Sequence, residues 1–224
     1  MGPLASAEFL KTIYESSLGG REQDSPVVLM YSDPSFPDRT EEFLRGSVDE
    51  LLNRLIVALE FLLGMGASRI VICCTTMHYL LPRLPRELTP RIISLVDTIL
   101  GAVGQSQKRH LMICTNGTRK LKLFESHGLW QPLKGYIQFP DDGDQEMIHH
   151  DLIYRIKKNQ GVDEMIPLLE SLLSKYRTDS FITGCTELHL VTKRLKTRRG
   201  GRSYSYVDPL MTIARQLAER PYEA

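Results

Sequence analysis

The chain has 224 residues, and its 28 basic and 27 acidic side chains give a formal net charge of +1 at pH 7. This balance argues against binding to nucleic acid or to anionic membranes, which both favour a strongly positive protein surface. The length suits one large domain or two small lobes. Polar residues interrupt the longest apolar stretch, residues 51–63, so the sequence predicts no membrane span.

The four cysteines are too few and too irregularly placed for a disulfide framework. Adjacent Cys73 and Cys74 also lack the C-x2-C spacing that is typical of zinc sites. We therefore expect reduced thiols, a cytoplasmic location and no metal ion.

Helical and extended patterns alternate in the N-terminal half. Apolar residues recur at helical spacing from Ser6 to Leu18, and Gly19–Gly20 ends this pattern. Ser47 and Glu50 form a capping-box signature at the start of a second helix. The elements expected here are, in order, helix 6–18, strand 27–31, loop 32–40, helix 47–63, strand 69–74, strand 92–96 and helix 97–103.

The C-terminal half continues the alternation. The elements expected here are strand 110–114, helix 119–126, strand 135–139, helices 144–158 and 162–176, strand 180–184, a helix that ends near Leu195, strand 204–207 and helix 209–219. Strands that alternate with helices are typical of a parallel sheet covered by helices. The basic stretch 193–202 lacks interleaved aromatic residues, so we interpret it as a solvated loop and not as a nucleic-acid site.

Two short stretches, one in each half of the chain, share a pattern. Residues 69–74 and 180–185 are apolar runs that end in a Cys-Thr pair and precede a helical pattern. A thiol at the carboxyl end of a parallel strand lies at the edge where open α/β sheets bind ligands, and a following helix N-terminus favours its thiolate. Cys74 and Cys185 are therefore candidate acid–base residues for the two faces of one carbon atom.

Other polar or reactive residues have simpler interpretations beside the functional ones. Cys73 and Cys114 lie inside apolar runs, where cysteine most often fills space as a small apolar side chain. Arg39, in a proline-bounded loop, is either a solvated cation or a fork for a substrate carboxylate. Lys158, near the end of a predicted helix, is either a favourable C-terminal charge or a second carboxylate ligand.

Five motifs, taken in order, resemble those of the aspartate/glutamate racemase family. They are Met1-Gly2-Pro3-Leu4-Ala5-Ser6, Pro37-Asp38-Arg39-Thr40, Cys74-Thr75-Thr76-Met77-His78, Ile153-Tyr154 with Lys158, and Gly184-Cys185-Thr186-Glu187-Leu188. Their order and spacing cover essentially the whole chain. The histidine after the first cysteine motif is similar to that of the aspartate-type branch of the family.

This resemblance implies an α/β fold with two pseudosymmetric lobes, each a mainly parallel sheet flanked by helices. The active site would lie in the cleft between the lobes. The first lobe would comprise residues 1–103 and 208–224, and the second lobe residues 104–207. Members of the family use neither pyridoxal phosphate nor a metal, so no cofactor is expected, and the resemblance also suggests a homodimer.

The resemblance also assigns roles to residues. Cys74 and Cys185 would be the two catalytic acid–base residues, and Arg39 and Lys158 would hold substrate carboxylates. The remaining substrate contacts would come from main-chain amides and side chains of Met1, Gly2, Pro3, Leu4, Thr75, Thr76, Thr118, Thr186 and Glu187. Thr75 stands where the family usually has asparagine, so one amide group that would orient the substrate is missing.

The predicted function is racemisation of a dicarboxylic amino acid, aspartate or else glutamate, without pyridoxal phosphate, by one cysteine thiolate and one cysteine thiol. The predicted partner is this small-molecule amino acid alone. Hydantoin racemases and maleate isomerases, which have the same architecture, are the alternatives. Arylmalonate decarboxylases need only one of the cysteines, and the presence of both argues against them.

A non-catalytic relative that binds a small acid is the remaining alternative. Relatives have a strand and a glycine pair ahead of the first motif, whereas this sequence starts at Met1. We therefore expect the gene to encode an apolar run of about six residues ahead of Met1, and we expect the longer chain to be more stable and more active.

Overall fold

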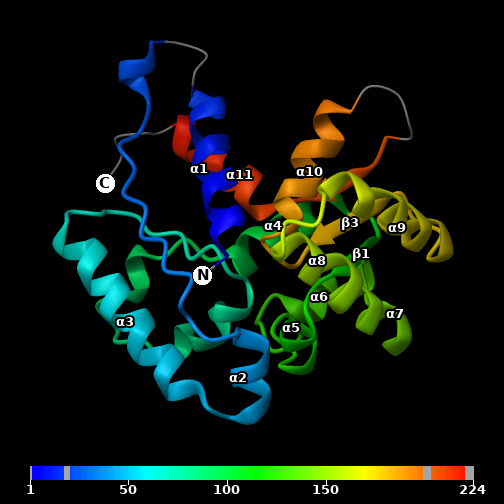
Figure 1. Cartoon of the computed structure of the whole chain (residues 1–224), viewed down its shortest axis with the longest axis horizontal. Helices are drawn as coiled ribbons and strands as arrows, with labels where there is room; N and C mark the ends of the chain where they lie inside the picture. Colours follow the sequence, from blue (N-terminus) through cyan, green and yellow to red (C-terminus); the bar gives the residue numbers. More distant parts are fainter. Residues whose placement is uncertain (1, 18–20, 199–202, 220–224) are drawn as a thin grey trace.

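The computed structural model describes residues 2–17, 21–198 and 203–219, and its helices surround one parallel sheet (Figure 1). The α-helices are α1 (Pro3–Ser17), α2 (Arg39–Arg45), α3 (Val48–Gly64), α4 (Leu95–Ser106), α5 (Asn116–Lys120), α6 (Trp130–Leu133), α7 (Asp142–Met147), α8 (Tyr154–Lys157), α9 (Val162–Lys175), α10 (Leu188–Thr197) and α11 (Pro209–Glu219). A π-helical segment (Ile148–Ile153) joins α7 to α8, and short 3-10 helices span Glu22–Asp24, Thr76–Arg83, Thr89–Arg91 and Lys134–Tyr136.

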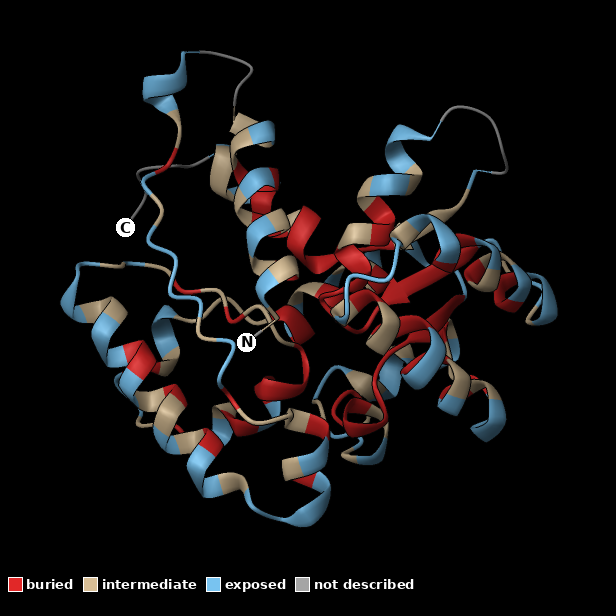
Figure 2. Ribbon diagram, in the orientation of Figure 1, coloured by how far each residue is buried: buried red, intermediate tan, exposed pale blue. Residues whose placement is uncertain are grey.

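The sheet lies in the second lobe and has four parallel strands. They are β1 (His110–Ile113), β2 (Ile137–Gln138), β3 (Ser180–Thr183) and β4 (Ser205–Val207), in the order β2-β1-β3-β4. Every residue of β1 and β3 is buried, as expected for central parallel strands with helices on both faces. Figure 2 shows this burial concentrated in the sheet and the helix faces that touch it. The predicted α/β class and the parallel, helix-covered sheet are confirmed.

Side chains of the two central strands alternate between two hydrophobic clusters. Leu111 and Phe181 point to a cluster formed with the π-helical segment, α8, α9 and α10. Met112 and Ile182 point to the opposite cluster, formed with α4 and α6. Because β1 and β3 are parallel neighbours, their carboxyl ends lie side by side. The helices that follow them start just beyond these ends.

The sheet expected in the first lobe is not formed within the described residues. Strands were expected at residues 27–31, 69–74 and 92–96. Within the described residues, these segments form one parallel bridge, between Ile70 and Ile92. The N–H of Ile70 donates to the carbonyl of Arg91 at 2.7 Å, and the N–H of Ile93 donates to the carbonyl of Ile70 at 2.8 Å. Residues 27–31 run extended and largely exposed, without a neighbouring strand. The prediction of a sheet in each lobe was therefore wrong for the first lobe.

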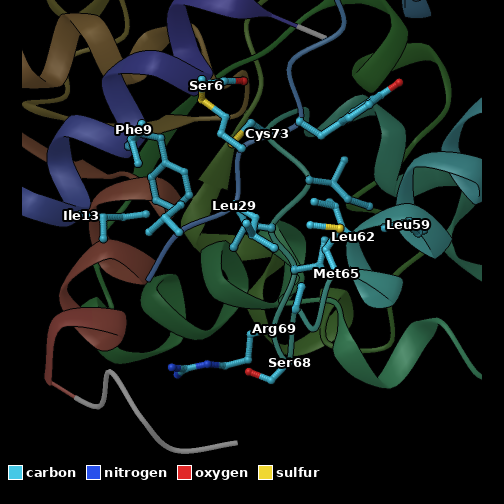
Figure 3. Close-up of a pocket in the computed structure, with 18 of the residues that line it drawn as sticks. Ser6, Phe9, Ile13, Leu29, Leu59, Leu62, Met65, Ser68, Arg69 and Cys73 are labelled. Atoms are coloured by element: carbon cyan, nitrogen blue, oxygen red, sulfur yellow. The ribbon is translucent and has the colours of Figure 1, made fainter. Parts of the chain in front are cut away.

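A cavity of about 500 Å³ lies beside two of these segments. Residues 26–31 and 65–73 both line it, together with residues of α1 and α3. Figure 3 shows apolar side chains such as Phe9 and Leu62 around it, with Ser6 and Cys73 at one end. Burial raises the pKa of Cys73 to about 12, so this thiol is a neutral part of the wall.

The C-terminal helix α11 packs on α1 and α4, with Leu210, Ile213, Phe9, Ile13 and Leu95 in one cluster. Its bounds agree with the predicted helix 209–219. This packing agrees with the return of the chain to the first lobe, although the lobe boundaries themselves stay a prediction. Residue 103, the predicted end of the first segment, lies within α4.

A buried polar network joins α1, α10 and the start of α11. His189 Nδ1 donates to Asp208 Oδ2 at 2.7 Å, and His189 Nε2 lies 2.8 Å from Thr12 Oγ1. Thr192 also donates its hydroxyl proton to Asp208. Asp208 Oδ1 accepts the N–H of Leu210 and caps α11. The network holds the helix that follows Cys185 against the first lobe.

Within the described residues, no helix is both long enough and apolar enough to cross a bilayer.

Candidate active site

The two Cys-Thr turns lie next to each other, although 110 residues separate them in the sequence. Cys74 follows the extended segment of the first lobe and precedes the 3-10 helix Thr76–Arg83. Cys185 follows β3 and precedes α10. The hydroxyl of Thr186 donates to the main-chain carbonyl of Cys73 at 3.2 Å, and this bond joins the two turns directly.

His78 holds the first cysteine turn in place. Its Nδ1 lies 3.0 Å from the carbonyl oxygen of Cys74, which can only accept, so Nδ1 carries the proton. Its Nε2 then accepts the N–H of Leu95 at the start of α4, also at 3.0 Å. Burial lowers the pKa of His78 to about 4, so the ring is neutral near pH 7. The neutral histidine therefore links the main chain of Cys74 to the start of α4 through two hydrogen bonds.

A cavity of about 100 Å³ opens beside these turns. It is lined by Gly2, Pro3, Leu4, Pro34, Arg39, Lys157 and Glu187. Gly2, Pro3 and Leu4 lie at the start of α1, Pro34 lies in the loop before α2, and Arg39 is the first residue of α2. Lys157 and Glu187 come from the second lobe. The cavity is small and carries two cations and one carboxylate, so it suits a small, anionic molecule.

Arg39 lies at the start of α2, and its Nη1 donates to the carbonyls of Phe36 and Pro37. Its Nε is buried and has no hydrogen-bond partner among the described residues. Burial alone would lower the pKa of Arg39, but electrostatic interactions with Cys74, Asp38 and Glu187 raise it above the usual value. A buried guanidinium with one unused donor is suited to bind a carboxylate.

Glu187 is paired with the second cysteine. The thiol of Cys185 donates to Glu187 Oε2 at 2.9 Å, and Thr186 Oγ1 lies 3.3 Å from the same oxygen. Burial, and then the charge of Glu187, raises the pKa of Cys185 well above its usual value. Gly2, just before α1, lies against Glu187, so that a β-carbon there would displace the carboxylate from its present position.

Three buried threonines line the junction on the side of β1. Thr76 Oγ1 lies 3.0 Å from Thr118 Oγ1 and 3.3 Å from Thr115 Oγ1. Thr115 caps α5 by accepting the N–H of Thr118. The hydroxyl of Thr75 is buried without a partner in the part of the chain that the structure describes. Thr75 and Thr76 therefore bring hydroxyls to the same region as Thr118.

A model of the Asp/Glu/Hydantoin racemase family matches residues 1–217 of this chain. The chain belongs to this family.

Solved structures show that the fold agrees with this family. Picrophilus torridus aspartate racemase is similar over 97% of this chain and 90% of that chain, with a TM-score of 0.79 and 19% sequence identity. A putative Asp/Glu racemase from Yersinia pestis is similar over 98% of this chain and 95% of that chain, with a TM-score of 0.70 and 18% identity. At these identities the likeness concerns the fold alone.

A glutamate racemase from Shewanella woodyi is 28% identical over 141 residues, which are 61% of this chain. The chain spans about half the length of this curated relative, since the match covers 51% of it.

Most of the residues that the family resemblance singles out are gathered at the cleft. Gly2, Pro3, Leu4, Arg39 and Glu187 line the small cavity. The cysteine turns and Thr75, Thr76, Thr118 and Thr186 adjoin it through the contacts given above. Met1 lies outside the described residues. The assigned roles of these residues stay proposals.

Lys158 is the exception, and the prediction for it was wrong in position. The structure places Lys158 at the exposed C-terminal end of α8, while its neighbour Lys157 lines the cavity. Lys157 Nζ lies 3.6 Å from Asp38 Oδ2 and 4.0 Å from the centre of the Tyr154 ring.

Lys157 lies near the carboxylates of Asp38 and Glu187. Burial would lower its pKa, but electrostatic interactions with Cys185, Glu187, Tyr154 and Asp38 raise it above the usual value. Lys157 therefore stays charged and compensates negative charge in the cleft.

Sequence reasoning also missed two residues that support the site. Tyr154 donates its hydroxyl proton to Asp38 Oδ2 at 2.6 Å, which connects α8 to the cap of α2 across the cleft. Both lie within the motifs quoted above, but neither was given a role. Hydrogen bonding between distant residues leaves no spacing signal that could have revealed this pair.

In the ranges that the structure describes, no group of three or more histidine, cysteine, aspartate or glutamate side chains is placed to hold a metal ion.

Proposed function

We propose that this chain racemises a dicarboxylic amino acid, with aspartate as the first candidate and glutamate as the second, without pyridoxal phosphate. The observation that carries the proposal is the position of Arg39. Its buried Nε has an unused donor, and its guanidinium interacts with both Cys74 and Glu187, one from each cysteine turn. A carboxylate bound there would hold an amino acid between the two thiols.

In the proposed reaction, one cysteine enters as thiolate and removes the α-proton, and the other donates a proton from its thiol to the opposite face. General acid–base catalysis contributes about 10²–10⁴-fold. An α-proton next to a carboxylate is so weakly acidic that the rest must come from electrostatic stabilisation of the enolate-like charge. Arg39 and Lys157 supply positive charge at the cavity, and the start of α1 adds the positive end of a helix dipole.

The charges of the cavity favour a dicarboxylic substrate over a neutral amino acid. Arg39 can take one carboxylate through its free donor, and Lys157 can take a second from the opposite wall. A substrate with a single carboxylate would engage only one of these two cations.

The test is exchange of the α-proton for deuterium in heavy water, followed by NMR for a panel of amino acids. We expect exchange and racemisation of aspartate, slower or no exchange of glutamate, and none of alanine. The Cys74→Ala/Cys185→Ala double variant is the control and should show no exchange. Exchange that is faster with hydantoins than with dicarboxylates, or that persists in the double variant, would contradict the proposal.

We also propose that the protein works as a cytoplasmic homodimer. An exposed apolar strip supports this assembly and includes Val27, Leu29, Met30, Tyr31 and Phe61, with the rings of Tyr31 and Phe61 5.8 Å apart. Sedimentation equilibrium at micromolar concentration should give twice the chain mass, and a monomer there would contradict the proposal.

A further inference from the structure

The loop of residues 32–38 leads into α2 and helps to place Arg39. Arg39 Nη1 donates to the main-chain carbonyls of Phe36 at 3.4 Å and of Pro37 at 3.1 Å. Pro34, in the same loop, lines the small cavity together with Arg39. Because a guanidinium is planar, the carbonyls that hold Nη1 also set the direction of the buried Nε–H, which has no partner among the described residues. The donor available to a substrate carboxylate therefore depends on where this loop lies.

Arg54, on α3, holds the loop by three hydrogen bonds. Its Nη2 donates to Asp33 Oδ2 at 2.7 Å and to Ser35 Oγ at 2.6 Å, and its Nη1 donates to the Ser35 carbonyl at 3.0 Å. Asp33 and Ser35 flank Pro34, so one guanidinium spans the turn on which Pro34 lies. Three bonds in this arrangement need the planar fork of arginine, since lysine offers only a point charge.

The loop presents acceptors to this guanidinium. Asp33 Oδ1 accepts both the main-chain N–H of Ser35 at 2.9 Å and the Ser35 hydroxyl at 2.6 Å, which closes a turn around Pro34. The other carboxylate oxygen, Oδ2, faces Arg54. Hydrogen bonds from Ser35 and then from Arg54 lower the pKa of Asp33 to about 2, so its carboxylate is charged at neutral pH.

Arg54 also contacts the residue whose carbonyl holds Arg39. The Phe36 ring is buried in the hydrophobic cluster that includes the inner face of α3. The guanidinium carbon of Arg54 lies 4.3 Å from the centre of this ring, which is within the range of a cation–π contact. Arg54 therefore holds the loop both at its turn and at Phe36.

An arginine on a helix often pairs with a carboxylate one turn away, and Arg54 has such a neighbour in Glu50. The contact between Arg54 Nη1 and Glu50 Oε1 is 3.7 Å, longer than any of the three bonds to the loop. The side chains of Arg54 and Asp33 are 28% and 23% exposed, so their pair is partly shielded from water and salt. The main partner of Arg54 is therefore the loop and not its own helix.

We propose that Arg54 is a positioning residue of the carboxylate site. It fixes the loop of residues 32–38, and the carbonyls of Phe36 and Pro37 in turn aim the unpaired donor of Arg39 at the substrate carboxylate. Arg54 acts through Arg39 and touches neither the substrate nor a thiol. This inference rests on the proposed racemase function, and it concerns a residue outside all five motifs of the family resemblance.

The first experiment compares the kinetics of Arg54→Met and Arg83→Met. Methionine still covers Phe36 but has no donor, so KM for aspartate should rise about fivefold to tenfold, as for a lost hydrogen bond, while kcat stays within about twofold. Arg83→Met is the matched control, because Arg83 Nη2 donates to Asp49 Oδ1 of the same helix α3 at 2.9 Å. Its KM should stay within about twofold of the parent. An unchanged KM in Arg54→Met, or a fall in kcat alone, would overturn the proposal.

A double variant tests whether Arg54 acts through Arg39. In the Arg39→Lys chain the fork that Arg54 positions is already absent. Adding Arg54→Met to this chain should therefore raise KM by less than about twofold further. Two independent effects would multiply instead, and a multiplied KM would overturn the proposal.

Asp33→Asn approaches the same contact from the loop and covers the case in which Arg54→Met does not fold. Asparagine can keep the turn around Pro34 but loses the charge that faces Arg54. KM for aspartate should rise at least about threefold, because a charge-assisted hydrogen bond becomes a neutral one. An Asp33→Asn chain with the KM of the parent would contradict the proposed role of the contact.

The closing experiment measures binding and needs no racemisation. Succinate, a dicarboxylate without an amino group, is titrated into each chain and followed by calorimetry. Its Kd should rise about fivefold to tenfold in Arg54→Met and stay within about twofold in Arg83→Met. If aspartate is not racemised but succinate shows this difference, the racemase proposal fails and the role of Arg54 stands. Equal succinate affinity in the parent and Arg54→Met chains would overturn the inference, and so would a parent chain that binds neither succinate nor aspartate.

Discussion

Thr186 donates its hydroxyl proton to the carbonyl oxygen of Cys73 across the boundary of the two lobes, at 3.2 Å. The bond starts next to one candidate catalytic cysteine and ends next to the other. The distance between the two thiols therefore depends on it, and a racemase of the proposed type needs both thiols at one carbon atom.

Thr186→Val keeps the shape of the side chain and removes this bond. We expect kcat for aspartate racemisation to fall at least about tenfold while KM changes little, because the loss concerns the alignment of the two thiols. Stability should fall by about 1 kcal/mol, the usual net value of one hydrogen bond. Thr186→Ser should restore most of the activity. A Thr186→Val enzyme with unchanged kcat would show that the thiols are aligned without this bond.

Arg39→Lys tests the carboxylate site. Lysine keeps the charge but replaces the planar donor fork by a point charge, so KM for aspartate should rise at least about tenfold. Steady-state kinetics with aspartate measures this effect. Arg45→Lys on the exposed end of α2 is the control, because the ion partners of Arg45 among the described residues, Glu41 and Glu42, lie on its own helix. Unchanged kinetics in Arg39→Lys would place the substrate carboxylate elsewhere.

Lys157 and Lys158 can be compared as neighbours. Lys157→Ala removes a cation from the cavity wall and its contact with Asp38, and we expect kcat/KM for aspartate to fall at least about 30-fold. Lys158→Ala removes an exposed cation at the end of α8 and should leave kcat/KM within about twofold of the parent, as for most surface changes. The reverse result would mean that α8 is rotated from the position described here.

The pKa of Asp208 in the folded protein predicts how the stability of the protein depends on pH. Burial would raise the pKa of its carboxyl, but hydrogen bonds and charge from His189, and a bond from Thr192, hold the pKa below its usual value. The folded state therefore binds this proton less readily than the unfolded state. Stability should be fully present above the usual carboxyl pKa of 3.8 and should be lost as pH falls below it.

The variant Asp208→Asn keeps an oxygen to cap α11 but loses the charge opposite His189. We expect it to lower the free energy of unfolding at pH 7 by about 1.5–3 kcal/mol, the usual value of a hydrogen bond to a charged group. Urea unfolding at several pH values measures both effects. The variant should also lose part of the acid dependence between about pH 4 and pH 2, and identical acid profiles would contradict the assignment.

The sequence by itself determined the elements whose signals are local. The short, mainly apolar stretches of β1 and β3 indicate buried parallel strands, and every residue of both strands is buried. The helix Pro209–Glu219 was predicted with its observed bounds, because proline at its first position and Asp208 as its cap are local signals. The Cys-Thr turns were recognised for the same reason.

Only the tertiary structure decided the features that depend on partners distant in the sequence. An apolar run forms a strand only if another strand pairs with it, and residues 27–31 face a cavity instead. Which of the adjacent Lys157 and Lys158 lines the cavity depends on how α8 packs, with Ile156 in the cluster below the sheet. The closeness of Glu187 to Cys185 depends on the side-chain conformations in the folded turn, since two residues in one turn can point in different directions. Motif spacing carries no information on these contacts, because they form only when the lobes come together.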